Sequence, residues 1–119
     1  MAYHDFTEMP VWQLGNEIVK DIYDLTEDLP KREDFALCSQ LRRAAVSITG
    51  NIAEAFGRGH IKDKINFYYF SRGSAHEVRS HLFCTKTAKY FTDIQIDPIQ
   101  KKCLRLIEGV NKIIKGLSS

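Results

Sequence analysis

The feature that most constrains the fold is a long helical pattern at residues 40–58 with two faces that both look unsuited to solvent. Apolar residues recur at steps of three and four and form a core stripe: Leu41, Ala45, Ile48, Ile52 and Phe56. Polar residues follow the same rhythm on another side: Gln40, Arg43, Ser47, Asn51, Glu54 and Arg58. Small residues such as Ala44, Gly50 and Ala53 lie among them, whereas a solvated face normally carries long charged side chains. We therefore predict a helix with a core face and a second buried or half-buried face that another backbone approaches closely.

Length and composition indicate a single globular domain over residues 1–119. The chain has 119 residues, 44% hydrophobic and 27% charged, which is an ordinary balance for one domain with one core. No apolar run reaches the roughly 18 residues of a membrane span. The first residues carry two acids and no basic segment, so no signal peptide is predicted and the expected location is cytoplasmic. The three cysteines lie far apart without a CxxC pair, which is typical of reduced core thiols.

Hydrophobic spacing predicts four helices and no strand. Prolines and glycines indicate the helix boundaries. Pro10 suits a first helical turn, Pro30 ends the first helix, and Gly57 with Gly59 ends the second. Asp97 is expected to cap the last helix, with Pro98 in its first turn and residues 91–96 as a loop. The predicted helices are approximately 10–29, 33–57, 61–90 and 98–117.

Four consecutive aromatic residues, Phe67 to Phe70, interrupt the usual two-sided helix pattern. At 100° per residue they point to every side of the third helix, and a helix that is apolar all round is buried all round. In a bundle of only four helices each helix should keep one solvent side, so this run indicates contact with another chain. Small residues follow at once, and Gly73 in mid-helix costs about 1 kcal/mol relative to alanine, which fits close packing.

Charge is unevenly distributed, although the net charge is only +2. Residues 1–30 hold one base and seven acids, whereas residues 31–119 hold 16 bases and eight acids. Clustered lysine and arginine residues are what phosphate contacts require. The candidate nucleic-acid strip lies on the outer face of the last helix: Lys101, Lys102, Arg105, Lys112 and Lys115. The alternative is an ordinary solvated helix face, and a further hypothesis pairs this basic strip with the acidic face of the first helix on another subunit.

Specific stretches resemble the four-helix-bundle family of the 23S rRNA intervening-sequence protein, also known as the S23 ribosomal protein family. The matching residues are Val11-Trp12-Gln13, Ile22-Tyr23, Leu25-Thr26, Gln40 to Ile48, Asn51-Ile52-Ala53-Glu54, Gly57-Arg58, Phe67, Arg72-Gly73-Ser74 and Glu77. The resemblance spans nearly the whole chain, and the stretch around Asn51 to Arg58 is its most specific part.

This resemblance implies an all-α, antiparallel up-and-down four-helix bundle that assembles as a ring-shaped homopentamer. Some relatives are encoded inside rRNA intervening sequences, and a more distant one accompanies a reverse transcriptase, binding it and nucleic acid. The resemblance implies no enzymatic activity. The second and third helices are expected to supply much of the subunit interface, through Arg43, Ser47, Asn51, Glu54, Arg58, Phe70 and Ser74.

Enzymatic alternatives find little support in the sequence. His76-Glu77 and His81 form HExxxH rather than HExxH, and five residues on a helix separate the two histidines by about 140°, so they do not share a face. Asn51 and Glu54 share a face and have the residue types of an acid and its orienting partner, but a structural polar network at a subunit contact is the favoured interpretation. We predict no catalytic, cofactor or metal site and no membrane partner.

The sequence therefore predicts a non-enzymatic assembly or adaptor protein whose main partner is itself. The alternative is an RNA- or DNA-binding accessory protein that uses the basic face of the last helix and associates with rRNA or with a reverse transcriptase.

Overall fold

The structure, a computed structural model, describes residues 2–119 and confirms the all-α fold. Four helices account for most of the chain: α1 (Pro10–Thr26), α2 (Leu37–Gly57), α3 (Ile61–Thr87) and α4 (Asp93–Ser118). Short 3-10 turns, η1 (Phe6–Glu8) and η2 (Lys31–Glu33), precede α1 and α2. The described residues contain no strand.

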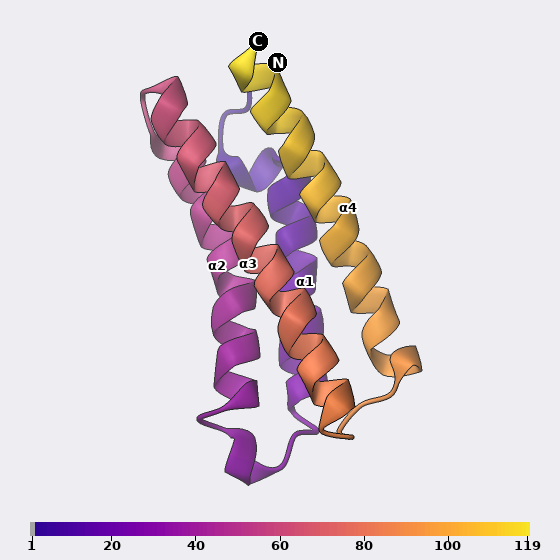
Figure 1. Ribbon diagram of the computed structural model, residues 1–119. Coiled ribbons are helices and arrows are strands. Elements are labelled where there is room, and N and C mark those ends of the chain that lie inside the picture. Colours follow the sequence, from indigo (N-terminus) through magenta and orange to yellow (C-terminus); the bar gives the residue numbers. More distant parts are fainter. Residues whose placement is uncertain (1) are drawn as a thin grey trace.

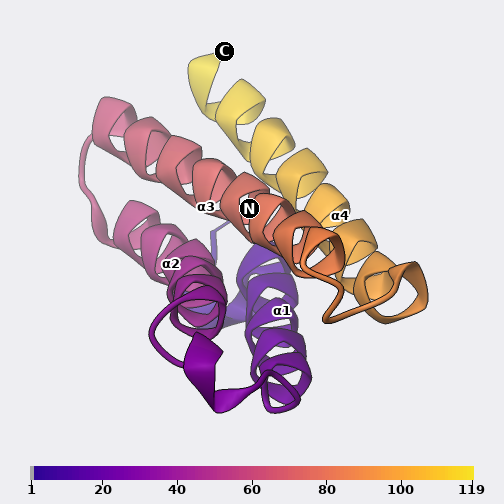
Figure 2. The same ribbon diagram turned by 60° about the horizontal axis from the view of Figure 1, so that its bottom comes forward.

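The helices run alternately down and up, so that each is antiparallel to the next and the first and last described residues lie at the same end (Figure 1). Contacts join α1 to α2, α2 to α3, α3 to α4 and α4 back to α1, which places the four helices at the corners of a square (Figure 2). The bundle measures 44 × 23 × 21 Å. Among residues 2–119, no helix combines the length and the hydropathy needed to cross a bilayer.

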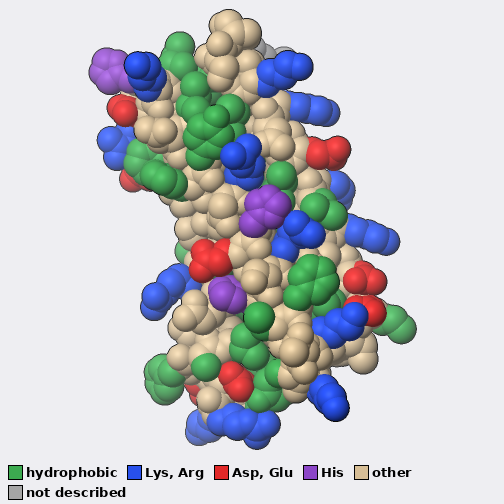
Figure 3. Space-filling model, in the orientation of Figure 1, with side chains coloured by type: hydrophobic (Ala, Val, Ile, Leu, Met, Phe, Trp, Pro, Cys, Tyr) green, Lys and Arg blue, Asp and Glu red, His purple; other side chains and the backbone are tan. Residues whose placement is uncertain are grey.

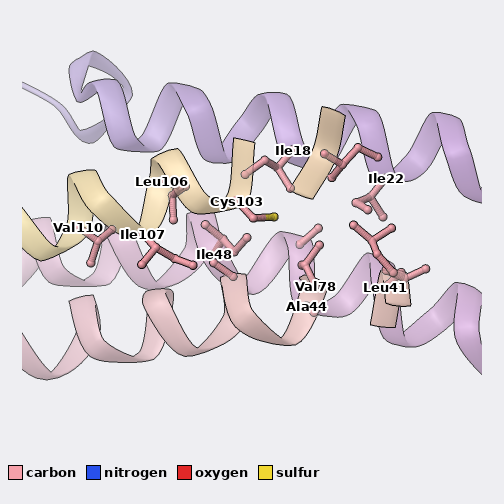
Figure 4. Close-up of a cluster of buried hydrophobic side chains, with 14 of the residues drawn as sticks. Ile18, Ile22, Leu41, Ala44, Ile48, Val78, Cys103, Leu106, Ile107 and Val110 are labelled. Atoms are coloured by element: carbon pink, nitrogen blue, oxygen red, sulfur yellow. The ribbon is translucent and has the colours of Figure 1, made fainter. Parts of the chain in front are cut away.

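The core runs along the axis of the bundle and draws one apolar stripe from each helix. Figure 4 shows Ile18, Ile22, Leu41, Ile48, Val78 and Leu106 converging there, with the Cys103 thiol among them. Gly15 allows a close approach of α1 to α2, because a Cβ at that position would lie 3.0 Å from Thr49 Cγ2 and 3.2 Å from Ile48 Cγ2. A glycine on α1 therefore sets the distance between α1 and α2.

The start of α4 corrects the sequence prediction, which placed a loop at residues 91–96 and a cap at Asp97. The helix begins at Asp93, and a capping box formed by Thr92 and Gln95 satisfies its first turn, with Thr92 N donating to Gln95 Oε1 at 2.9 Å. Pro98 therefore lies inside the helix, where it removes one backbone hydrogen bond. Burial of Ile96, which has no exposed area, favours the earlier start.

Three other helix ends lie a few residues inside the predicted bounds. α1 ends at Thr26 rather than near 29, and α3 ends at Thr87 rather than near 90. Residues 33–36, predicted as the first turn of the second helix, belong instead to the end of η2 and to a connection that leads to α2. Glu33 lies in this segment and contacts the start of α2, because its Oε1 accepts from Leu37 N at 3.3 Å. Its Oε2 accepts from the Tyr90 hydroxyl at 2.8 Å.

Candidate subunit interface and basic face

The second face of α2 is half-buried, and the backbone that approaches it is α3 of the same chain. Ser47 Oγ and Ser74 Oγ lie 2.8 Å apart across the two helices. Asn51 Nδ2 donates to the Ser47 carbonyl at 2.8 Å and to Ser47 Oγ at 3.0 Å. One turn away, Ser71 Oγ donates to the Ile48 carbonyl at 2.9 Å. Short hydroxyl side chains thus let α2 and α3 come close while their polar atoms are satisfied.

The far end of the same seam is held by charge and aromatic contacts. Arg58 Nε lies 3.2 Å from Glu54 Oε2, and its guanidinium carbon lies 4.6 Å from the centre of the Phe67 ring. Phe67 in turn meets Phe70 edge to face, with ring centres 5.6 Å apart. Glu54 therefore finds its cation one turn along its own helix, a pairing that the i, i+4 spacing favours.

The seven predicted interface residues fall into two groups and one outlier. Ser47, Asn51 and Ser74 are joined by hydrogen bonds. Glu54 pairs with Arg58, the Arg58 guanidinium lies over the Phe67 ring, and Phe67 contacts Phe70. Arg43 is exposed and makes no ion pair with residues 2–119. Within one chain, the backbone that approaches Ser47 and Asn51 is α3. The predicted contact of these seven residues with another subunit stays a prediction.

The aromatic run of α3 divides between the core and the surface. Tyr68 is 4% exposed and Phe67 is half-buried, whereas Tyr69 and Phe70 are 42% and 56% exposed. Arg72 covers part of Tyr69, with its guanidinium carbon 4.7 Å from the ring centre. Phe70 thus leaves more than half of its apolar side chain uncovered beside the α2–α3 seam.

The outward surfaces of α2 and α3 carry uncharged residues, among them Gly50, Ala53 and Gly73, which the sequence analysis had associated with close packing. On α2 these residues are Val46, Gly50, Ala53 and Gly57, spaced by four, three and four. On α3 they recur every seven residues: Asn66, Gly73, Ser80 and Thr87. We call these eight residues the small-residue face. Its heptad spacing is visible in the sequence once the core-facing positions are removed.

The glycines of this face have no packing role inside the chain. A Cβ at Gly50 or at Gly73 would meet nothing within 4 Å, in contrast to Gly109, where it would lie 2.8 Å from Val11 Cγ1. Gly50 and Gly73 nevertheless lie within long helices, where glycine costs about 1 kcal/mol relative to alanine. The fold of one chain does not account for either residue.

The basic strip of α4 lies along one edge of the molecule, where Figure 3 shows Lys and Arg side chains interspersed with acidic ones. Lys102 of this strip forms ion pairs with α1, because its Nζ lies 2.8 Å from Asp21 Oδ2 and 3.4 Å from Glu17 Oε1. The hydrogen bond with Asp21 raises the pKa of the Lys102 ammonium. The acidic face of α1 and the basic face of α4 therefore meet within one chain at this point.

The other four residues of the strip stay accessible. Lys101, Arg105, Lys112 and Lys115 are exposed, and the ion pairs found among residues 2–119 do not include them. The free cations of α4 are thus four rather than the five counted in the sequence.

The histidines of the HExxxH segment have separate partners. His81 Nε2 lies 3.5 Å from Glu77 Oε2, whereas His76 Nδ1 lies 3.2 Å from an Arg79 nitrogen. Within residues 2–119, no group of three His, Cys, Asp or Glu side chains is placed to hold a metal ion.

Comparison with known proteins places this geometry in a family. Residues 7–112 match the family described as 23S rRNA-intervening sequence protein. The chain is also similar to a crystal structure of a protein with unknown function from the S23 ribosomal protein family of Bacteroides thetaiotaomicron VPI-5482. The two have 25% sequence identity and a TM-score of 0.81, over 88% of this chain and 95% of that one. No curated protein matches this sequence. Because the family match extends from η1 well into α4, the chain belongs to the family of the 23S rRNA-intervening sequence protein.

Proposed function

We propose that this chain is a non-enzymatic assembly or adaptor module that forms a homo-oligomeric ring through the small-residue face of α2 and α3. The observation that carries this proposal is the pair of exposed mid-helix glycines, Gly50 and Gly73, around which one chain leaves open space. Small residues on a helix surface allow a second helix backbone to approach, which gives both glycines a role that they lack in the single chain.

The composition of this surface supports the same proposal. Its eight residues are uncharged, and the exposed acids Glu54 and Glu77 lie one helical turn beyond Gly50 and Gly73. Val46 is 47% exposed within it, and Phe70 beside it is 56% exposed. Arg43, exposed and without an ion pair in residues 2–119, lies next to Val46 along α2 and supplies a cation for an acid of a neighbouring subunit. Phe70 and Arg43 are of the residue types enriched at such interfaces.

Five subunits are the proposed number, and this number rests on the family resemblance rather than on the packing of one chain. The α2–α3 seam joins the two helices that carry the small-residue face, through hydrogen bonds among Ser47, Asn51 and Ser74. Such a ring presents five copies of every outward surface, which suits an adaptor that gathers a partner by repeated weak contacts.

The experiment that tests assembly uses glycine-to-leucine variants. Light scattering at micromolar concentration should give a pentamer for the natural chain and smaller species for Gly50→Leu and Gly73→Leu. Both variants should remain helical by circular dichroism, because neither position has an intrachain neighbour and leucine is the better helix former by about 0.8 kcal/mol. Gly116→Leu is the matched control, since Gly116 is also exposed, helical and free of neighbours but lies on α4.

Two results would contradict the proposal. A natural chain that stays monomeric at these concentrations rules out assembly altogether. An oligomer that survives both leucine substitutions places the interface elsewhere.

The second candidate function is nucleic-acid binding as an accessory protein, associated with rRNA or with a reverse transcriptase. The observation that favours it is the set of four exposed and unpaired cations on α4. Ring formation would repeat this strip around the assembly and multiply its attraction for phosphates.

Salt dependence separates this function from simple assembly. Binding of mixed RNA and DNA at low salt should weaken steeply as salt is added, and replacing one contacting cation should reduce the salt slope by about 1. Arg105→Gln should show this reduction, whereas Lys102→Gln should change the slope less, because Asp21 and Glu17 already hold Lys102. Absence of binding, or binding indifferent to salt, contradicts phosphate contacts.

A further inference from the structure

An apolar pocket lies at the end of the bundle where residues 2–3 and the start of α1 meet the last turns of α4. It encloses about 510 Å³, within the roughly 300–1,000 Å³ of typical small-molecule sites. Its lining comes from the first residues and from all four helices: Ala2, Tyr3, Met9, Pro10, Val11, Phe56, Lys64, Tyr68, Gly109, Ile113 and Leu117. Neither the small-residue face nor the basic strip contributes to it, so the pocket is a separate feature of the fold.

Among the described residues, Lys64 is the one charged residue that lines this pocket. Lys64 is half-buried, and its Nζ donates to the carbonyls of Ala55 and Phe56 at 3.1 and 3.0 Å, at the C-terminal end of α2. A lysine ammonium has three donors. Two of them are therefore used and fix the position of the group, while the third remains for a molecule in the pocket.

Tyrosine hydroxyls add further donors to the same pocket. Tyr68 is 4% exposed and lines the pocket, and the hydrogen bonds within residues 2–119 do not include its hydroxyl. Burial, and secondarily the neighbouring Tyr3, raise the pKa of Tyr68, so this hydroxyl keeps its proton near neutral pH. The pocket thus combines apolar walls with one ammonium and with phenolic donors, and its lining contains no carboxylate.

We propose that this pocket binds an unbranched aliphatic carboxylate of medium chain length. The alkyl chain lies against Met9, Val11 and Ile113, and the carboxylate accepts hydrogen bonds from the Lys64 ammonium and the Tyr68 hydroxyl. An anionic acceptor satisfies both groups at once, whereas an amine meets the Lys64 ammonium as a like charge. A primary alcohol uses the apolar walls and can accept from the Lys64 ammonium, but it carries no negative charge and so gains no attraction between opposite charges.

Calorimetric titration of the full chain with octanoate, octan-1-ol and octylammonium tests this assignment, at concentrations below micelle formation. Octanoate should bind most tightly and octylammonium least. Shortening octanoate to hexanoate should weaken binding by about fourfold for each CH₂ removed. Lys64→Met should weaken octanoate binding by roughly tenfold or more, because a hydrogen bond to a charged group is lost. Lys62→Met, an exposed position on the same helix outside this pocket, is the matched control and should leave binding unchanged.

Tyr68→Phe provides a second test that does not depend on the α2 carbonyls held by Lys64. It removes one hydroxyl, keeps the ring, and should weaken octanoate binding while leaving octan-1-ol binding less affected. The proposal is overturned if octanoate fails to bind the natural chain, or if octylammonium binds as tightly as octanoate. Octanoate affinity that is indifferent to Tyr68→Phe and to Lys64→Met, with both variants folded by circular dichroism, also overturns it. If Lys64→Met does not fold, the Tyr68→Phe result and the comparison of head groups decide the question.

Discussion

Ser47 and Ser74 face each other across the α2–α3 seam, with their hydroxyl oxygens 2.8 Å apart. Ser74 is buried and has no other side-chain partner in residues 2–119, whereas Ser47 also accepts from Asn51. The two ends of this hydrogen bond are therefore unequal. Loss of Ser47 leaves a buried hydroxyl without a partner, but loss of Ser74 leaves Ser47 still bonded.

This inequality gives a double-mutant prediction. Ser47→Ala should lower the free energy of unfolding by about 1–2 kcal/mol, because it leaves the buried Ser74 hydroxyl without a hydrogen-bond partner. Ser74→Ala should have a smaller effect, and the double variant should be no less stable than Ser47→Ala. Urea unfolding of all four chains measures the coupling. Strictly additive effects would show that the two hydroxyls do not depend on each other.

A second prediction concerns the only cation of the α4 strip that α1 holds. Asp21→Asn should lower stability by up to about 1 kcal/mol at neutral pH, as expected for a partly exposed ion pair. Asp28→Asn, in the turn that follows α1 and without an ion pair in the described residues, should have almost no effect.

The pH dependence of this pair has a definite sign. The hydrogen bond with Asp21, helped by Glu17, raises the folded-state pKa of Lys102 above the ordinary 10.5. Its contribution to stability is therefore complete below about pH 10.5 and is lost as pH rises through the folded-state value. A nuclear magnetic resonance titration of the Lys102 side chain should give a lower pKa in Asp21→Asn than in the natural chain. An identical value in both would mean that the carboxylate does not hold the ammonium.

Hydrophobic spacing predicted the helices well, because core burial fixes where apolar residues point. The helix ends were predicted less well, because several local signals compete there. Thr92 with Gln95 and Asp97 with Gln100 both have capping-box spacing, and only tertiary packing selects between them. Burial of Ile96 selects the first pair, and Gln100 is used elsewhere, donating to the Arg79 carbonyl at 3.1 Å.

The predicted second face of α2 shows a different limit of what residue spacing can predict. Spacing revealed that Ser47 and Asn51 needed a neighbouring backbone, but it did not identify the helix that provides it. In the structure α3 provides it. Gly50 and Gly73, around which a Cβ would meet nothing within 4 Å, are left for the proposed contact with another chain. The pocket around Lys64 left no periodic signal at all, because its lining comes from five separate parts of the chain.

The C-terminal end of α3 provides a stability prediction. Lys89 has a φ of 67°, the left-handed conformation that usually selects glycine after a helix, and Tyr90 N donates to the Thr85 carbonyl at 2.9 Å, as in a Schellman ending. Lys89→Gly removes a Cβ penalty of roughly 1–2 kcal/mol and adds some unfolded-state entropy, so a net gain of about 0.5–1 kcal/mol is expected. Thermal unfolding measures it, with Lys86→Gly, inside the helix, expected to lower stability. A loss of stability in Lys89→Gly would mean that the lysine side chain stabilises this turn.

The last prediction uses the three thiols as reporters of burial and of assembly. Cys38 and Cys103 are buried, and burial raises the pKa of Cys103 to about 12, so neither thiol should react in the native chain. Cys84 is exposed and lies on α3 one turn beyond Ser80 of the small-residue face. Alkylation followed by mass spectrometry should therefore label Cys84 alone, with the other two labelled only after unfolding. If this face forms the subunit contact, Cys84 should react faster in Gly73→Leu than in the natural chain. Cys84 of Gly116→Leu should react at the natural rate. Equal Cys84 alkylation rates in all three chains would mean that Cys84 does not lie at a subunit contact.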